Sequence, residues 1–347
     1  MSKHPSRPLL SPLVPAYKLA LWLRERRLGS RAEQIRRLRW PVVSIGNLST
    51  GGAGKTPLAI ALANALTQRD FRVDVLSRGY GRKGLAATLV KADGSWEQFG
   101  DEPLLIARKA CVPVYVAGQR YDAGVLAEAD AAAIAVLSVG QKPLVHLLDD
   151  GFQHRQLHHD VDILLLDRED WTDRLLPAGN LREPLKVIHR ASIVAIPAGD
   201  PQLDADLRAW GWQGPVWRLH RRMQVPAMDG PVAAFCGVAR PQQFFEGLEA
   251  GGLQLALHKA FPDHHGYSVK DFEGLMKAAR AAGAEALITT AKDLVRLGGL
   301  SSRVEDSLPV MTAGLEVEID DENQAIEALL ARLKLSSSPP AMREKAL

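Results

Sequence analysis

A glycine-rich loop that joins an apolar run to a helical pattern limits the possible folds of this chain more than any other feature. The segment PVVSIGNLSTGGAGKTPLAIALANAL, residues 41–66, contains the β-branched run Val42 to Ile45, three glycines within four positions and then apolar residues at helical spacing. In such a segment successive backbone N–H groups point toward one place, where the N-terminal end of the helix adds partial positive charge. The segment therefore predicts a buried strand, an anion-binding loop and a helix.

The residues that follow the glycines indicate that the bound anion is the polyphosphate of a nucleotide. Lys55 would reach the β- and γ-phosphates, and the hydroxyl group of Thr56 would be a ligand of Mg²⁺. Ser49 stands where the usual P-loop pattern begins with glycine, so the turn must be made by Gly51 and Gly52. The predicted phosphate contacts are Ser49, Thr50, Gly51, Gly52, Ala53, Gly54, Lys55 and Thr56. The alternative is a glycine-rich turn that binds no ligand.

Short apolar runs alternate with helical segments along most of the chain, which predicts an α/β fold. This alternation is typical of a P-loop-type, mostly parallel sheet that is covered by helices on both faces. The runs in the first part of the chain are Val42 to Ile45, Val73 to Leu76, Leu144 to Leu148, Ile163 to Leu166 and Ile193 to Ile196. The alanine-rich stretch Ala127 to Ala135 is predicted to be one of the covering helices.

A mixed basic stretch at residues 216–226 predicts a connector between two domains. We expect a nucleotide-binding core at residues 41–220 and a smaller α/β lobe at residues 221–335, with a disordered tail at residues 336–347. The smaller lobe would contain Val232 to Cys236, Leu253 to Leu257, Ala286 to Thr290 and a helix from Glu322 to Leu335.

Composition excludes several classes of protein. With 46% hydrophobic residues among 347, the chain can bury a large core, and a net charge of +3 argues against a polycation that binds nucleic acid. Cys111 and Cys236 both lie in apolar stretches, which predicts buried thiols in a reducing compartment. No apolar run is long enough to span a bilayer, no signal peptide is recognisable, and nothing indicates an obligate protein partner.

The N-terminal segment, residues 1–40, is predicted to form an amphipathic helix that associates with membranes. Its apolar residues at helical spacing are Leu9, Leu10, Leu13, Val14, Tyr17, Ala20, Leu21 and Trp22. Arginines follow them at positions 24, 26, 27, 31, 36, 37 and 39. Such a helix could lie on an anionic membrane surface, with the arginines at headgroup level. It could equally dock on the core of the protein itself.

Two adjacent carboxylates end another predicted strand. In KPLVHLLDDGFQH, the apolar run is followed by Asp149, Asp150 and the turn residue Gly151. Ligands of open α/β sheets collect at the carboxyl ends of the strands, so these acids would face the phosphate loop and hold Mg²⁺ directly or through water. An acidic turn or helix cap is the alternative.

Other acids and histidines are ambiguous when taken alone. Asp101, in the motif GDEP, precedes a predicted helix and is more typical of a helix cap than of a catalytic residue. Asp263, His264 and His265 could be part of a zinc site, a base with its orienting partner, or solvated loop residues. Zinc is disfavoured because no further histidine or cysteine stands nearby at ligand spacing.

Nine motifs, in the same order, resemble those of the tetraacyldisaccharide 4'-kinases, the lipid A 4'-kinase family. They are GNLSTGGAGKTP, LSRGYGRK, GDEP, AGQR, LLDDGFQH, LPAGNLREP, FCGVARPQQFF, FPDHHGY and TTAKDLVRL. The resemblance implies a two-lobed kinase that uses ATP and Mg²⁺ and lies peripherally on the cytoplasmic face of the bacterial inner membrane. The implied substrate is an acylated glucosamine disaccharide 1-phosphate, phosphorylated on its 4' hydroxyl group.

The resemblance also implies roles for individual residues. Asp101 matches the base that accepts the hydroxyl proton, and His264 rather than His265 matches its partner. Asp149 and Asp150 match acids that hold Mg²⁺ and stabilise the transition state. Arg78, Arg120 and Arg182 match basic positions that grip substrate or phosphate, and Asn180 stands where this family has proline.

Three other functions remain as alternatives. A P-loop kinase of a small soluble molecule would share the phosphate loop but would gain nothing from lipid. A switch-type nucleotide triphosphatase would act on a partner, although in TTAKDL the adjacent Lys292 and Asp293 do not match the spacing used to select guanine. A structural membrane adaptor would leave Lys55, Thr56 and Asp150 without a function.

Overall fold

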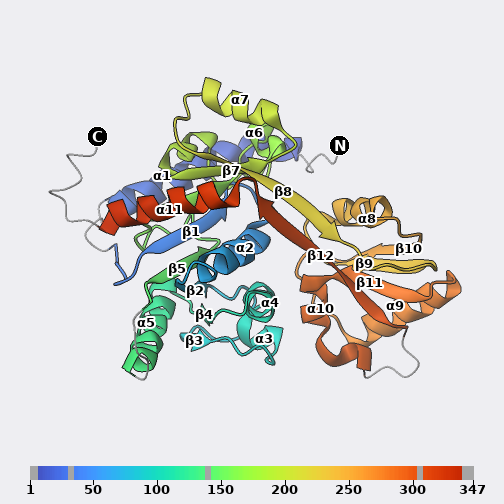
Figure 1. Ribbon diagram of the computed structural model, residues 1–347. Coiled ribbons are helices and arrows are strands. Elements are labelled where there is room, and N and C mark those ends of the chain that lie inside the picture. Colours follow the sequence, from blue (N-terminus) through green and yellow to red (C-terminus); the bar gives the residue numbers. More distant parts are fainter. Residues whose placement is uncertain (1–6, 30–34, 137–141, 303–307, 338–347) are drawn as a thin grey trace.

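The protein folds around one twelve-stranded, mostly parallel sheet, as seen in a computed structural model (Figure 1). The structure describes residues 7–29, 35–136, 142–302 and 308–337. The strand order is β10-β9-β11-β12-β8-β7-β6-β1-β5-β2-β4-β3, and among the strands of this sheet only the pairs β12–β8 and β3–β4 are antiparallel. Helices cover both faces of the sheet. The predicted α/β class is confirmed.

The elements alternate along the chain as the apolar runs predict. The strands are β1 (Val42–Asn47), β2 (Arg72–Ser77), β3 (Thr88–Leu89), β4 (Val114–Val116), β5 (Leu144–Asp149), β6 (Val161–Leu165), β7 (Ile193–Pro197), β8 (Val216–Gln224), β9 (Val232–Cys236), β10 (Leu255–Ala260), β11 (Ala286–Thr290) and β12 (Val310–Ile319). The α-helices are α1 (Val14–Gly29), α2 (Lys55–Thr67), α3 (Trp96–Phe99), α4 (Asp101–Lys109), α5 (Arg120–Val136), α6 (Arg168–Thr172), α7 (Pro201–Ala209), α8 (Pro241–Ala250), α9 (Val269–Ala281), α10 (Ala291–Leu297) and α11 (Glu322–Ser337). Short 3₁₀ helices lie at η1 (Pro8–Leu13), η3 (Leu185–Arg190) and η4 (Gly298–Ser302).

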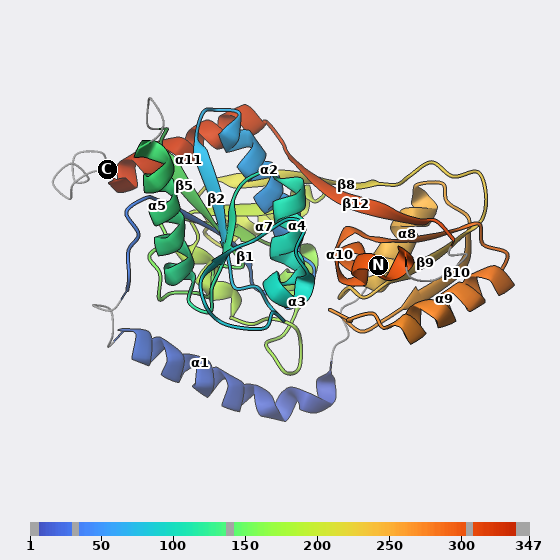
Figure 2. The same cartoon turned by 90° about the horizontal axis from the view of Figure 1, so that it is seen from below.

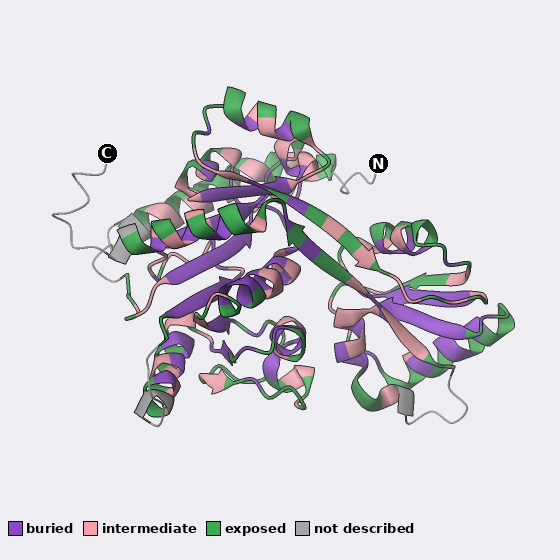
Figure 3. Cartoon of the chain, viewed as in Figure 1, coloured by how far each residue is buried: buried purple, intermediate pink, exposed green. Residues whose placement is uncertain are grey.

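The middle of the sheet is buried on both faces. Every residue of β1 and of β5 is buried, because helices pack above and below these parallel strands (Figure 3). Ile45 of β1 pairs with Asp149 of β5, so the ends of both strands lie at the same edge of the sheet. The loop after β1 and the two aspartates at the end of β5 are therefore neighbours.

Two long strands join the lobes of the molecule. We call residues 41–215 together with α11 the first lobe, and residues 231–302 the second lobe. β8 and β12 pair antiparallel from Leu219↔Ile319 to Gln224↔Gly314 and cross from one lobe to the other (Figure 1). The boundary predicted near residue 220 thus falls inside a strand of a continuous sheet, and no loop separates the lobes there.

The C-terminal helix corrects the predicted extent of the second lobe. Ile326, Leu329 and Leu333 of α11 are buried in one cluster with Val43 and Leu58 of the first lobe. The apolar face of α11 belongs there because β12 carries the chain back across the sheet. Ser336 and Ser337, predicted to be in the tail, extend α11, and the rest of the predicted tail lies outside the described residues.

Helix α1 has one docked side and one exposed side. Val14, Tyr17 and Leu21 pack on an apolar cluster of the first lobe, and α1 runs along the outside of that lobe (Figure 2). The exposed apolar side chains of η1 and α1 are Leu9, Leu13, Leu19, Trp22 and Leu23. Among the described residues, no helix combines the length and the apolar character that crossing a bilayer requires. Arg31 of the predicted basic run lies outside the described residues.

The prediction for the cysteines is half right. Cys236 is buried in β9, whereas Cys111 is exposed. Cys111 lies in the turn between α4 and β4 with a φ of +52°, so the apolar stretch around it is interrupted by a solvent-facing turn.

A buried ion pair links β5 to its neighbours. The side chain of His146 is fully buried, with Nδ1 at 2.7 Å from Asp74 on β2 and Nε2 at 3.4 Å from Glu128 on α5. Glu128 also accepts a hydrogen bond of 2.9 Å from the backbone N–H of Trp40. Burial lowers the pKa of His146, but the charges of Asp74 and Glu128 outweigh burial and raise it to about 9.

We predict that this pair stabilises the protein in a pH-dependent way. The folded pKa of His146 lies above its unfolded value, so its stabilisation is complete below about pH 6.5 and is lost as the pH rises through about 9. The Asp74→Asn variant lacks the main partner without gaining a buried charge. In urea unfolding, the wild type should be more stable than this variant at pH 6, and the difference should shrink by roughly 2–3 kcal/mol by pH 10. A difference that is constant with pH would show that His146 is not charged.

Candidate active site

The loop between β1 and α2 has the backbone geometry of an anion-binding loop. Gly51 and Gly54 have φ values of +111° and +86°, a conformation that glycine adopts without strain. Gly54 directly precedes the first helical residue, Lys55, so the N–H groups at the start of α2 border the loop. Ser49 and Thr56 are buried at the two ends of this segment. The structure therefore contains the predicted strand, loop and helix in sequence.

Segments from two other parts of the chain hold the loop. The backbone N–H of Thr50 donates to the carbonyl of Asn180 at 2.9 Å, and Asn180 itself is tied to Asp173 by hydrogen bonds of 2.9 and 3.1 Å. Asn180, at a position where the resemblance to the family predicts proline, thus helps to fix its loop. Arg221 of β8 donates to the carbonyl of Ala53 at 2.9 Å.

Arg221 also connects the loop to acidic residues after β6. Its Nη1 lies 2.9 Å from Asp167, which Arg240 at the start of α8 approaches to 3.5 Å. Gly51 faces the second lobe as well, since a Cβ atom on Gly51 would lie 3.4 Å from the Cβ of Ala239. The basic stretch that the sequence indicates as a connector therefore contacts the phosphate loop directly.

Asp150 lies between two cations. Lys55 Nζ donates to Asn47 Oδ1 at 2.9 Å and lies 3.4 Å from Asp150. Arg182 forms a two-pronged contact with Asp150 at 3.0 and 3.2 Å and also donates to Asn47. Burial raises the pKa of Asp150, but Lys55, Arg182 and Arg120 together hold it well below its usual range. Asp150 is therefore ionised at any physiological pH.

Asp149 has the opposite environment. It is 2% exposed, and neither of its carboxylate oxygens has a hydrogen-bond partner among the described residues. Burial, together with the charges of Glu102 and Asp150, raises the pKa of Asp149 to about 7. A buried carboxylate without partners is costly unless a cation completes it, and the donor set here is oxygen alone.

A cluster of basic groups lies beside this pair of aspartates. Burial lowers the pKa of Arg120. The charge of Asp150 raises this pKa and the charge of Arg78 lowers it. His154 lies close to Arg78 and Arg120, and burial together with these positive charges lowers its pKa to about 3. The predicted residues Arg78, Arg120 and Arg182 are thus brought together near Asp150, with the neutral His154 among them. These groups suit an anionic ligand.

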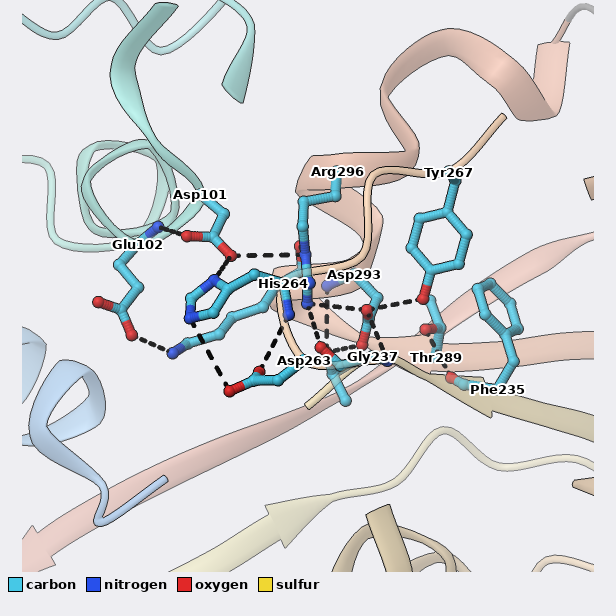
Figure 4. Close-up of polar contacts among 12 residues, drawn as sticks. Asp101, Glu102, Phe235, Gly237, Asp263, His264, Tyr267, Thr289, Asp293 and Arg296 are labelled. Atoms are coloured by element: carbon cyan, nitrogen blue, oxygen red, sulfur yellow. Dashed lines mark hydrogen bonds and ion pairs between the residues drawn. The ribbon is translucent and has the colours of Figure 1, made fainter. Parts of the chain in front are cut away.

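Asp101 and His264 meet across the two lobes (Figure 4). His264 Nδ1 lies 2.9 Å from Asp101 Oδ2, and the backbone N–H of Glu102 donates to Asp101 Oδ1 at 2.8 Å. His265 points elsewhere: it contacts Asp271 at 3.3 Å and stacks on the ring of Phe261. The structure therefore pairs His264, and not His265, with Asp101.

The pKa values of the pair shift in opposite directions. Burial raises the pKa of Asp101, but its hydrogen bond with His264 and the charges of His264, Lys292 and Arg296 lower it below its usual value. The hydrogen bond with Asp101 in turn raises the pKa of His264. Asp101 is an ionised carboxylate in contact with an imidazole, which suits the acceptance of a proton.

Several residues of the site escape the sequence analysis. Glu102 forms an ion pair with Lys292, and Arg296 lies 3.4 Å from Asp101. Lys292 and Arg296 belong to TTAKDLVRL, a motif whose sequence alone indicates no contact with Asp101 or Glu102. Asn47 and His154 carry no signal of their own beyond lying next to the glycine-rich loop and the paired aspartates.

No group of three or more histidine, cysteine, aspartate or glutamate side chains with the geometry of a metal site occurs in the described parts of the chain. Any cation at this site would therefore have to be held by one or two carboxylates, a hydroxyl group and the ligand itself. This coordination is typical of Mg²⁺ bound with a polyphosphate.

Comparisons with known proteins agree over nearly the whole chain. A family model described as tetraacyldisaccharide-1-P 4'-kinase matches residues 6–334. Proteins named tetraacyldisaccharide 4'-kinase are similar to the chain at 38% identity in Koribacter versatilis, covering 92% of this chain and 98% of that protein, and at 39% in Aquifex aeolicus, covering 77% and 82%. A crystal structure of LpxK from Aquifex aeolicus in complex with ATP is similar with a TM-score of 0.72 and 34% identity, covering 94% of this chain and 99% of that one.

A match of this length includes the phosphate loop, the paired aspartates and the contact between the lobes. The chain belongs to the tetraacyldisaccharide 4'-kinase family.

Proposed function

We propose that this protein transfers the γ-phosphate of ATP to the 4' hydroxyl group of tetraacyldisaccharide 1-phosphate, a step of lipid A biosynthesis. The observation that carries the proposal is the continuity of charged groups from the phosphate loop to the Asp101–His264 pair. The charge of Lys55 lowers the pKa of Asp149 and the charge of Glu102 raises it. Glu102 directly follows Asp101 in the chain. A bound triphosphate would thus end close to a proton acceptor.

The chemistry needs positioning and charge neutralisation more than covalent participation. The hydroxyl oxygen forms a bond to the γ-phosphorus while the bond to the β–γ bridging oxygen breaks, and ADP leaves with that oxygen. Asp101 accepts the hydroxyl proton, and His264 orients the carboxylate and can share the proton. Lys55, which lies 3.4 Å from Asp150, would contact the γ-phosphate and stabilise the charge of the transferred phosphoryl group.

Mg²⁺ would be held by Thr56, Asp149 and Asp150, and it would offset the charge of the phosphates and of these acids. The two unpartnered oxygens of Asp149 support this assignment, as does the buried position of Thr56 at the start of α2. Asp150 is already bound by Arg182, which suits an indirect contact through water. Arg78, Arg120 and Arg182 would grip the phosphates of the two substrates.

The same chain would work on the cytoplasmic face of the inner membrane as a peripheral protein. Acyl chains leave a bilayer only at a cost of about 0.8 kcal/mol for each CH₂ group, so the enzyme must approach the lipid. The exposed apolar side of η1 and α1 supports such an approach, and Arg26 lies over the ring of Trp22 at 4.2 Å. A switch-type nucleotide triphosphatase or a kinase of a soluble molecule would leave this surface without a function.

The phosphate loop is tested with Lys55→Ala. Phosphoryl transfer should fall by about 10³-fold or more, because the cation nearest the transferred group is lost. The assay combines labelled ATP, Mg²⁺ and the disaccharide monophosphate in detergent and measures the bisphosphorylated lipid. Lys142→Ala, which removes only a surface ion pair with Asp70, is the matched control and should keep wild-type activity. Equal activity in both variants would remove the loop from the mechanism.

The base is tested with Asp101→Asn. The single-turnover rate should fall by about 10²- to 10⁴-fold while the dissociation constant for ATP stays unchanged, because the carboxylate acts on the hydroxyl proton and not on the nucleotide. Asp70→Asn, at an exposed position, is the control. A loss confined to ATP affinity would contradict the role of Asp101 as base.

The membrane surface is tested with the triple variant Leu13→Ser, Leu19→Ser and Trp22→Ser, whose side chains are exposed. Sedimentation with vesicles that contain anionic lipid should fall by about tenfold or more, since each apolar side chain contributes roughly 1.5–3 kcal/mol when fully buried. Leu315→Ser changes an exposed leucine on β12 and should leave sedimentation unchanged. If the triple variant sediments like the wild type, another surface binds the membrane.

A further inference from the structure

Among the described residues, those that give the carboxylate of Asp101 a cationic contact all belong to the second lobe. Its own helix, α4, supplies only the backbone N–H of Glu102 at 2.8 Å. From the second lobe, His264 lies 2.9 Å from Oδ2 and the Nε of Arg296 lies 3.4 Å from the same oxygen (Figure 4). Lys292 forms an ion pair with Glu102, the neighbour of Asp101. Asp101 is 3% exposed, so water contributes little to its stabilisation.

The side chain of Arg296 is held in place by hydrogen bonds within the second lobe. It is 2% exposed, and its Nη2 donates to the carbonyl of Gly237 at 2.8 Å and to Asp293 at 2.9 Å. Asp293 is held in turn by the backbone N–H of Gly237 at 2.9 Å and by the hydroxyl group of Tyr267 at 2.8 Å. All of these groups belong to the second lobe, so the guanidinium approaches α4 as a rigid unit.

Charged side chains from several elements surround Asp101. Its own helix α4 contributes Glu102, α10 contributes Lys292, Asp293 and Arg296, and the loop before α9 contributes Asp263 and His264. The end of β5 adds Asp149, which interacts with Glu102 and Lys292. Burial favours the protonated form of Asp101, whereas the hydrogen bond with His264 and the charges of His264, Lys292 and Arg296, all in the second lobe, favour the ionised form.

We propose that Arg296 is a positioning residue for phosphoryl transfer, which keeps the carboxylate of Asp101 ionised and aimed when the second lobe lies against α4. The inference rests on the proposed function, in which Asp101 accepts the hydroxyl proton. Asp101 would then have both of its partners only in this arrangement of the lobes, because Arg296 and His264 both belong to the second lobe. A purely structural ion pair between Arg296 and Asp293 is the alternative.

The test compares single-turnover rates of full-length variants with those of the wild type from pH 8 to pH 5, at saturating ATP, Mg²⁺ and lipid substrate. Loss of a cation within 4 Å raises the pKa of an aspartate by about one to three units. The ratio of Arg296→Gln to wild-type rate should therefore fall by about twofold to tenfold as the pH is lowered from 8 to 5. Arg296→Lys, which keeps the charge, should show a ratio that does not depend on pH.

Tyr267→Phe is the matched control, because it removes a hydrogen bond of 2.8 Å from the same buried network without changing its charge. Its melting temperature should fall while its rate ratio stays constant with pH. If Arg296→Gln does not fold, Asp293→Asn is tested in its place. This variant removes the carboxylate that competes with Asp101 for the guanidinium of Arg296, so the ratio of its rate to the wild-type rate should stay constant or rise toward pH 5.

The outcomes separate three failures. A rate ratio of Arg296→Gln that is constant with pH, or one of Asp293→Asn that falls like the ratio expected for Arg296→Gln, would overturn the role of Arg296. Wild-type protein that forms no bisphosphorylated lipid would overturn the proposed function instead. An active wild type in which Asp101→Asn is harmless would overturn the role of Asp101 as base, and with it the reason for a positioning residue.

Discussion

The hydrogen bonds between β8 and β12 join the second lobe to the first and bring it beside α4. Because the two strands pair from Leu219↔Ile319 to Gln224↔Gly314, the sheet continues from one lobe into the other. Residues of the second lobe can therefore meet α4 at defined distances, as in the 2.9 Å contact of His264 with Asp101. Asp101 belongs to the first lobe and its partner His264 to the second, so this pair needs both lobes. The proposed chemistry thus depends on an antiparallel pairing within a sheet that is otherwise almost entirely parallel.

Neighbouring positions in the chain acquire different acidities from their surroundings. Asp149 and Asp150 follow one another, yet Lys55 and Arg182 hold the pKa of Asp150 low while burial raises that of Asp149. The positive φ of Asp150, +49°, turns the chain so that its side chain faces these cations and that of Asp149 stays buried. A cation that binds here would neutralise the carboxylate of Asp149, whereas the carboxylate of Asp150 is already paired with cations of the protein.

The sequence is sufficient for the local elements and insufficient for contacts between them. Val42 to Ile45 and the glycines after it predict β1 and its loop, because alternation and glycine spacing are local properties. The ion pair of Arg296 with Asp101 joins positions 195 residues apart, counted from 101 to 296, and no local pattern reports it. The exposure of Cys111 and the packing of α11 on the first lobe likewise depend on where distant segments meet. Motif order identifies the family, and only the fold explains why TTAKDLVRL lies beside GDEP.

The return of α11 to the first lobe has a consequence for biosynthesis. β12 and α11 complete a core whose other members, such as Val43 and Leu58, leave the ribosome some 270 residues earlier, counted from Val43 and Leu58 to Glu322. The nascent nucleotide-binding half must therefore wait, with part of its apolar surface uncovered, while the intervening lobe is translated. Because domains generally fold as units in the order of their synthesis, the second lobe can fold while the core of the first still lacks β12 and α11. A chain that stops before residue 310 would expose this surface permanently, so premature termination would yield an aggregating fragment and no partial kinase.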